Sequence, residues 1–278
     1  MAPSSPGRSA RGMIYMFPLI RILCACVVLL APAAFAQSDP LAGVGVVLMH
    51  GKGGRPSSNI NGLASALKQQ GAIVVTPSMA WAGSRGVVAA YDVTYEQALA
   101  DVGAAVAQLR SQGARKIVVA GQSLGANAAI AYAARAPGGL AGVIALAPGH
   151  TPDRMRQPKI VQAVADARAA IAAGQGGARG SFPDSNQGQF AMVPGNTAAW
   201  YSYNDPNGTA SMPKNAARLS LPFLYVVGTS DRIHEAGRGY IFARAKPNPK
   251  SRYVEVNAGH FDTPEAAKAD VIAWLKTL

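Results

Sequence analysis

One serine stands in a setting suited to nucleophilic chemistry. Ser123 is the middle residue of Gly-Gln-Ser-Leu-Gly at 121–125, which follows the β-branched run 116–120 and precedes the alanine-rich stretch 126–135. This order predicts a strand, a tight turn and a helix, because small residues two before and two after the serine let both backbones approach closely. The serine is then held at the top of a sheet, at a helix N-terminus that favours negative charge. This context disfavours an ordinary surface turn.

A nucleophilic serine needs a base within hydrogen-bonding reach and a carboxylate that orients the base. Active residues of parallel α/β sheets lie at the carboxyl ends of strands, which restricts the candidates. Asp231 follows the apolar run 223–227 through a short loop, and His260 follows the run 253–256 in the same way. We therefore predict a catalytic triad of Ser123, Asp231 and His260.

Other histidines and one other acid compete for these roles. His50 follows the first predicted strand, and we interpret it as structural, holding its turn. His150 stands at the mouth of the predicted sheet, where it either lines the substrate pocket or is an ordinary loop residue. His234 is expected to be exposed. Asp262 is the main rival for the acid, but it is too close in sequence to His260 to reach the far side of the ring easily.

The elements that must position these residues alternate along the chain. Short apolar runs predict strands at 44–49, 72–77, 116–120, 143–146, 223–227 and 253–256. Between them, helical patterns cover 60–67, 95–111, 126–135, 158–173, 235–245 and 263–275. Alternating strands and helices predict an α/β fold, a mostly parallel sheet of about six strands with helices on both faces.

Two of these helices carry possible capping residues at their starts. Ser57, Ser58 or Asn59 is placed to cap the first helix. Thr263 is placed to cap the closing helix, with Pro264 in its first turn.

The alternation of predicted strands and helices is interrupted between residues 148 and 220. The stretch 174–215 is rich in Gly, Pro, Ser and Asn, and it also contains aromatic residues. An irregular segment of this length is commonly a lid or a binding loop, so we predict a lid-like insert. The residues expected to line the substrate pocket are Trp81, His150, Trp200 and Tyr201. The alternative role of the aromatic side chains, packing the lid onto the core, stays open.

The N-terminal segment has the pattern of a secretory signal peptide. Three arginines precede an apolar run at 22–35, which ends in Ala-Phe-Ala at 34–36. An N-terminal membrane anchor is the alternative, but the apolar run is shorter than the roughly 20 residues that a span needs. Cleavage after Ala36 would also remove Cys24 and Cys26, the only cysteines. We predict a signal peptide over 1–36, one domain over 37–278, and a periplasmic or secreted location.

Composition supports one compact domain and argues against nucleic acid as a partner. Of the 278 residues, 49% are hydrophobic and 14% are charged, which is not the composition of a disordered chain. The formal net charge is +12, but the basic residues are scattered. The densest basic cluster contains few interleaved aromatic residues on which bases could stack, so we interpret it as a solvated face. Weak association with an anionic envelope surface is compatible with this charge.

No cofactor or metal is indicated by the spacing of ligand residues. The stretch 45–52 faintly resembles a phosphate loop, but the glycines are spaced wrongly and Gly53 stands where Ser or Thr must bind magnesium. We therefore reject nucleotide binding. No Cys/His or paired-carboxylate cluster has the spacing of a metal site.

Several motifs together resemble the α/β-hydrolase family, and in particular a small exported bacterial esterase-like member. The resemblance covers 44–278. Its motifs are the nucleophile elbow at 121–125, the acid loop at 228–231, the histidine loop at 258–261 and the turn His50-Gly51 after the first strand. The chain departs from the family by lacking the usual first two strands and the extended His-Gly-Gly-Gly form of that turn.

The resemblance implies roles for individual residues. Ser123 would attack an acyl carbonyl, His260 would move the proton, and Asp231 would orient the imidazole. The backbone N–H groups of Leu124 and of Lys52, or alternatively Gly53, would bind the oxyanion. We expect the Lys52 side chain to be solvated.

These observations favour an exported serine hydrolase of carboxylic esters that works through an acyl-enzyme on Ser123. A peptidase, thioesterase, lipase or acyltransferase would use the same triad, because the triad does not choose the leaving group. A non-catalytic binding protein of the cell envelope, acting through its basic face, is the alternative from another class. The sequence does not indicate an oligomeric state.

Overall fold

The computed structural model describes residues 39–135 and 138–278. The predicted signal peptide, with Cys24 and Cys26, lies outside the described residues. No helix in the described part is long and apolar enough to cross a membrane.

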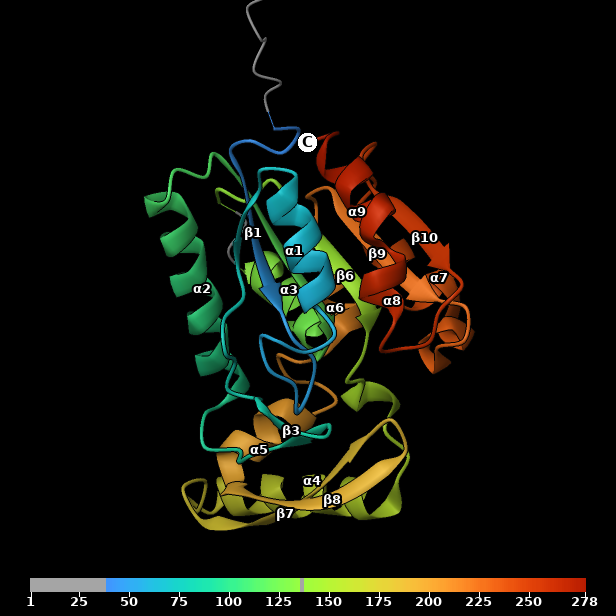
Figure 1. Ribbon diagram of the computed structural model, residues 1–278. Helices are drawn as coiled ribbons and strands as arrows, with labels where there is room; N and C mark the ends of the chain where they lie inside the picture. The colour runs from blue at the N-terminus through green and yellow to red at the C-terminus, as the bar shows by residue number, and fades with distance from the viewer. Residues whose placement is uncertain (1–38, 136–137) are drawn as a thin grey trace, which may run out of the picture. The chain divides into compact units, whose positions relative to one another are not determined.

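A six-stranded sheet organises the domain, and every pairing within it is parallel (Figure 1). Its spatial order is β10-β9-β6-β5-β1-β2. The strands are β1 (Val44–Met49), β2 (Ile73–Val75), β5 (Lys116–Ser123), β6 (Gly142–Pro148), β9 (Phe223–Gly228) and β10 (Arg252–Val256). The predicted parallel α/β fold is confirmed.

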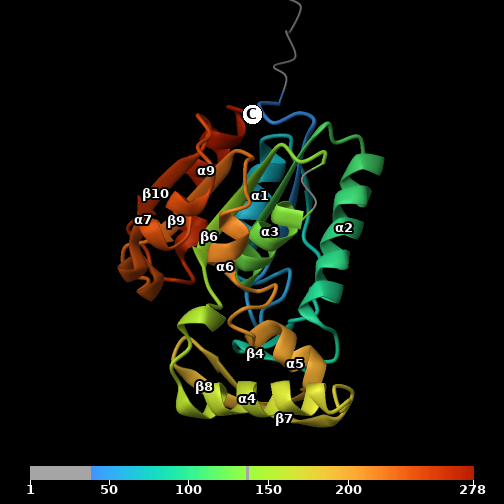
Figure 2. The same ribbon diagram turned by 180° about the vertical axis from the view of Figure 1, so that it is seen from behind.

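Alternate residues of the central strands enter two hydrophobic cores. Val46 and Leu48 of β1 pack with α1 (Asn61–Gln69) and α9 (Lys268–Leu275) on one face. On the other face, Val47 and Met49 pack with α2 (Tyr95–Ser111) and α3 (Leu124–Arg135). The two views from opposite sides show these layers (Figure 2). Both faces of β1 are buried, which explains its continuous apolar sequence.

The insert between β6 and β9 is regular, so the prediction of an irregular segment is wrong. It consists of η1 (Pro152–Arg154), α4 (Pro158–Ala172), β7 (Arg179–Asn186), β8 (Gln189–Asn196), α5 (Thr197–Asn204) and α6 (Met212–Ala216). In Figure 1, α4, α5 and the β7–β8 hairpin lie beyond the carboxyl ends of the strands.

Turn geometry and hairpin topology explain why the sequence of this insert resembles that of a loop. Gln187 and Gly188 connect β7 to β8 with φ values of 48° and 83°, and a two-residue turn with both φ positive matches the twist of a hairpin. A two-stranded sheet has only edge strands, which tolerate the Pro183 and Pro194 that would interrupt a central strand. Phe182 stacks on Trp200 with ring centroids 5.2 Å apart, joining the hairpin to α5.

Two predicted helices are divided, and the predicted caps are wrong. The stretch 235–245 spans η2 (Arg232–Ala236), α7 (Gly237–Tyr240) and η3 (Phe242–Arg244), because Gly237 has a φ of 65°. The closing helix is split into α8 (Thr263–Ala266) and α9.

The side chains proposed as caps have other partners. Ser58 accepts a hydrogen bond from the Arg55 N–H, and Asn59 donates to the Phe261 carbonyl, so α1 starts without a side-chain cap. The Thr263 hydroxyl donates to the Gly259 carbonyl. These hydrogen bonds connect the loops around the site and do not cap a helix N-terminus.

Candidate active site

The serine turn is formed where β5 ends and α3 begins. Ser123 is the last residue of β5 and has a φ of 57°, a left-handed conformation that places it at the apex of a sharp turn. A Cβ on Gly121 would collide with the Gly125 backbone, and one on Gly125 would stand 2.6 Å from the Met49 carbonyl oxygen. Both glycines are therefore required for strand and helix to approach.

The three side chains predicted to form a triad are in hydrogen-bonding contact. The Nε2 atom of His260 lies 2.9 Å from Ser123 Oγ, and its Nδ1 atom lies 2.7 Å from Asp231 Oδ2. An ionised carboxylate only accepts hydrogen bonds, so Nδ1 carries the proton and Nε2 accepts from the serine hydroxyl. All three residues are buried. The structure thus brings together one nucleophile, one base and one acid from the ends of β5, β10 and β9.

Asp262, the rival acid, is not in this chain of contacts. It is exposed and precedes α8, whereas both oxygens of Asp231 are engaged, Oδ2 by His260 and Oδ1 by the Ile233 N–H at 3.3 Å. The geometry therefore assigns the imidazole's partner to Asp231.

Gly149 is a site residue that sequence reasoning missed. A Cβ at this position would stand 2.6 Å from Ser123 Oγ and 3.3 Å from His260 Cε1. Its absence leaves open the space in front of the serine hydroxyl. A glycine three residues after the predicted strand 143–146, which follows the nucleophile strand along the chain, was the available signal.

The turn after β1 is held by His50 and Trp81. The His50 Nδ1–H donates to the Gly51 carbonyl at 2.8 Å, while Nε2 accepts from the Met79 N–H at 3.1 Å. Burial lowers the pKa of His50 below its usual value, so the ring is neutral. Trp81 is fully buried and its indole N–H donates to the His50 carbonyl. The structural interpretation of His50 agrees with these contacts.

Backbone hydrogen bonds discriminate between the two candidate donors on this turn. The Gly53 N–H already donates to the Trp81 carbonyl at 2.9 Å. The Lys52 N–H finds no acceptor within residues 39–135 and 138–278. Leu124, the other predicted donor, is the first residue of α3, and the N–H groups of a first helical turn have no partner inside the helix. Lys52 and Leu124 are therefore the available pair.

The Lys52 side chain is not solvated, which corrects the expectation from sequence. Its Nζ lies 2.6 Å from Asp184 Oδ1 of β7, and each side chain is only 4% exposed. Lys52 also reaches the Ser185 carbonyl at 3.4 Å. A lysine buried in this way needs a paired carboxylate. The ion pair therefore joins the turn that carries the candidate oxyanion donor to the insert.

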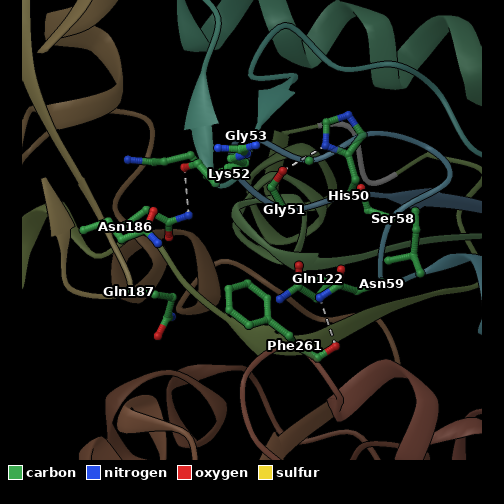
Figure 3. Close-up of a pocket in the computed structure, with 15 residues that line it drawn as sticks. His50, Gly51, Lys52, Gly53, Ser58, Asn59, Gln122, Asn186, Gln187 and Phe261 are labelled. Carbon is green, nitrogen blue, oxygen red and sulfur yellow. Dashed lines mark hydrogen bonds between the residues drawn. The ribbon is translucent and has the colours of Figure 1, made fainter. Parts of the chain in front are cut away.

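Two cavities flank the triad. One, of about 420 Å³, is lined by Ser123, His260 and His150 together with residues of η1, η2 and the β7–β8 turn. The other, of about 720 Å³, lies against the Gly51 turn and contains the half-exposed Phe261 ring (Figure 3). Lys52, Asn186 and Gln187 line both cavities, so the hairpin tip stands between them.

Of the residues predicted to line the pocket, only His150 does. Trp81 and Trp200 are fully buried, and Trp200 donates its indole N–H to the Pro183 carbonyl inside the insert. The Tyr201 hydroxyl accepts from Arg168 on α4, away from the triad. The sequence left open that these aromatic side chains pack inside the protein instead of lining the pocket. Trp81 and Trp200 do so.

His150 is a neutral member of the pocket wall. Its Nε2–H donates to the Tyr203 carbonyl at 2.7 Å. Burial, helped by the charge of Lys52, lowers the pKa of His150 to about 3. It therefore carries no charge at neutral pH. Within the described residues, no group of three or more His, Cys, Asp or Glu side chains could hold a metal ion.

Comparison with known proteins agrees with this architecture. The family model described as serine aminopeptidase, S33, matches residues 44–260. A monoacylglycerol lipase from Paleococcus ferrophilus has a TM-score of 0.62 at 22% identity, over 84% of this chain and 94% of its own. A structure described under two metagenome-derived lipolytic enzymes, LipS and LipT, has a TM-score of 0.60 at 19% identity, over 85% and 95%.

A thermophilic esterase from Thermogutta terrifontis is similar at a TM-score of 0.57 and 21% identity, over 85% of this chain and 90% of its own. No curated protein matches the sequence. At these identities the solved structures show a shared fold.

Proposed function

Because this chain belongs to the serine aminopeptidase (S33) family of α/β-hydrolases, we propose that it is a serine hydrolase that cleaves carboxylic esters. The observation that carries the proposal is the continuous contact from Ser123 through His260 to Asp231. It supplies a nucleophile, a general base in the correct tautomer and a buried carboxylate that stabilises the imidazolium.

The proposed reaction has two halves. Ser123 Oγ attacks the ester carbonyl as its proton passes to His260 Nε2, and His260 returns that proton to the departing alcohol, leaving an acyl-enzyme. Water then attacks the acyl carbon, gives its proton to His260, and the acid leaves as Ser123 Oγ regains the proton. In both halves the Lys52 and Leu124 N–H groups bind the oxyanion, where one donor is typically worth a factor of about 10²–10³.

Charges in the catalytic cavity favour an ester over the amino-terminal peptide bond that the family description names. An aminopeptidase must bind the ammonium group of its substrate next to the scissile bond. Among the residues that the structure describes, the cavity around Ser123 has Arg154 and Arg232 in its wall, and Glu235 is its only carboxylate apart from Asp231. The similar structures reported above are those of lipolytic enzymes and an esterase, which also supports ester hydrolysis.

Labelling with a fluorophosphonate probe tests the nucleophile. We expect one modified peptide, containing Ser123, and loss of both labelling and p-nitrophenyl ester hydrolysis in Ser123→Ala, by on the order of 10⁶-fold. Asp231→Asn should lose several orders of magnitude, because the wrong imidazole tautomer is favoured. Asp262→Asn, a matched control at an exposed carboxylate two residues after His260, should change turnover little.

Failure to label a folded protein would overturn the hydrolase assignment and favour a binding protein. Faster cleavage of an aminoacyl p-nitroanilide than of any ester would instead favour the peptidase.

Export is the second part of the proposal, and it rests on the pattern of residues 1–36. Cleavage after Ala36 would leave a mature chain that begins at Gln37. N-terminal sequencing of the protein recovered from the periplasm or medium tests this. An intact N-terminus in a membrane fraction would support the anchor instead.

A further inference from the structure

Two guanidinium groups reach the catalytic cavity from different elements. Arg154 ends η1, which follows β6, and Arg232 begins η2, directly after the triad residue Asp231. Both line the cavity of about 420 Å³ that contains Ser123 and His260. Any substrate that fills this cavity lies within reach of two positive charges.

Neither guanidinium is neutralised by the protein. Across residues 39–135 and 138–278, no carboxylate lies within salt-bridge distance of Arg154 or Arg232, and neither side chain donates a hydrogen bond. The neighbouring Asp153 carboxylate accepts from the Tyr240 hydroxyl at 2.9 and 3.0 Å and forms no salt bridge with Arg154. These two cations therefore keep their hydrogen-bonding capacity for another partner.

Both side chains are nevertheless placed by neighbouring residues. The Arg154 guanidinium lies over the Tyr240 ring, with its central carbon 4.8 Å from the ring centroid. The Arg232 nitrogens lie 3.8 Å from the position that a Cβ on Gly188 would take, so Arg232 extends to the tip of the β7–β8 hairpin. Two planar donors held at a cavity wall suit bidentate binding of an oxyanion.

The two arginines form a positive part of the cavity wall. Glu235 is the carboxylate that shares this wall with them, and Asp231 is directed at Nδ1 of His260. Lys52 is paired with Asp184, and His150 is neutral. The two guanidinium groups therefore remain the cations that can offer paired N–H donors to a planar carboxylate of the substrate. The positive wall also raises the local concentration of anionic ligands.

We propose that the substrate is an ester that carries a carboxylate group, and that Arg154 and Arg232 bind this carboxylate while Ser123 attacks the ester carbonyl. The inference rests on the proposed ester hydrolysis and adds the class of substrate to it. It assigns specificity to two arginines outside the triad.

Paired esters that differ in one charge test the proposal. On the acyl side, 4-nitrophenyl hydrogen glutarate is compared with neutral 4-nitrophenyl pentanoate. On the alcohol side, 3-butyryloxybenzoate is compared with its methyl ester. In at least one pair we expect kcat/KM to favour the anionic member by about 10-fold or more at low salt, with the preference falling as salt is added. The favoured pair also shows which portion of the substrate carries the carboxylate.

Variants at the cavity should change this ratio in opposite directions. Arg154→Gln and Arg232→Gln should each lower the anionic preference by about 5- to 30-fold, as expected for loss of a charge-assisted contact at a partly exposed site. Glu235→Gln should raise it. Arg156→Gln is the matched control, because Arg156 donates to the Asp153 and Met155 carbonyls and is absent from the cavity wall. It should leave the ratio unchanged.

The outcomes separate this inference from the proposed function. Neutral esters cleaved as fast as their anionic partners in both pairs would overturn the inference and leave ester hydrolysis standing. A preference lost in Arg85→Gln, in the neighbouring cavity, but kept in Arg154→Gln and Arg232→Gln would overturn the placement. Absence of all ester turnover and of fluorophosphonate labelling would refute the hydrolase itself.

Discussion

The ion pair between Lys52 and Asp184 allows a sharp test of how the insert supports the site. Asp184→Asn keeps the shape of the side chain but removes its charge. Lys52 Nζ, 2.6 Å from the carboxylate oxygen in the native protein, is then left as a buried cation with no charged partner. Its remaining acceptors are neutral, namely the amide oxygen of the new side chain and the Ser185 carbonyl at 3.4 Å.

Burial sets the size of the effect. Removing one partner of a buried ion pair costs about 3–5 kcal/mol. For a domain of this size, 1 kcal/mol corresponds to roughly 2–4 °C in Tm, so Asp184→Asn should lower Tm by about 6–20 °C. Lys52→Met should cost a similar amount, because it leaves the carboxylate with one N–H donor, that of Ser185. The double variant should recover most of the loss, since a neutral pair is often tolerated.

Turnover should change with stability, because Lys52 also provides a backbone N–H next to the serine. Displacement of this N–H weakens its stabilisation of the transition state. We therefore expect kcat for p-nitrophenyl esters to fall by up to about 10²-fold while KM changes less. The double variant is the control, because it removes the buried charge imbalance together with the ion pair.

Thermal melts and steady-state kinetics at pH 7, repeated at lower pH, complete the test. Burial raises the pKa of the Asp184 carboxyl, but the Lys52 ammonium more than offsets this, and the pKa lies below the usual 3.8. A depressed carboxyl pKa stabilises the fold above the unfolded value, and this stability is lost as pH falls through the folded pKa. The difference between native and Asp184→Asn should therefore shrink below about pH 4. A Tm within 2 °C of the native value at pH 7 would refute the reasoning.

Three further substitutions test the surroundings of the site. The pKa of His150 is about 3 in the folded protein, so as pH falls below 6.5 the unfolded chain binds a proton that the folded protein does not. The free energy of unfolding should therefore drop by up to about 1.4 kcal/mol per pH unit. Urea titrations at several pH values should show a smaller slope in His150→Gln. Trp81→Phe, which loses the bond to the His50 carbonyl, should destabilise by about 1–3 kcal/mol yet leave acyl-chain preference unchanged, and a shifted preference would place the ring in the pocket. Tyr91→Phe should leave Tm unchanged or raised, because the buried hydroxyl has no hydrogen-bond partner in the described chain; a loss above about 1 kcal/mol would indicate a bond to Asp184.

The triad geometry was predictable because each member lies next to the strand that positions it. Ser123 ends β5, Asp231 follows β9 by three residues, and His260 follows β10 by four. Strand patterns are local, and parallel strands bring their carboxyl ends to one edge. The partner of His260 therefore followed from sequence order alone.

Features that depend on folding of the insert were not predictable. Asp184 lies 132 residues from Lys52, and no local pattern connects them. The composition of the hairpin resembles that of a loop, so its strands were missed and with them the reason for a buried lysine. Trp81 and Trp200 show a related limit, because residue type indicates large apolar area but not whether it faces a pocket or a core.

The placement of cations around Ser123 follows a single physical rule. Lys52 is buried and has a protein carboxylate, since a charge removed from water must be compensated by a fixed partner. Arg154 and Arg232 remain exposed at the cavity, where water compensates them until another anion arrives. The same hairpin provides Asp184 to the first cation and its Gly188 turn to Arg232. Changes in this hairpin should therefore alter catalytic competence and charge preference together, although they lie outside the triad.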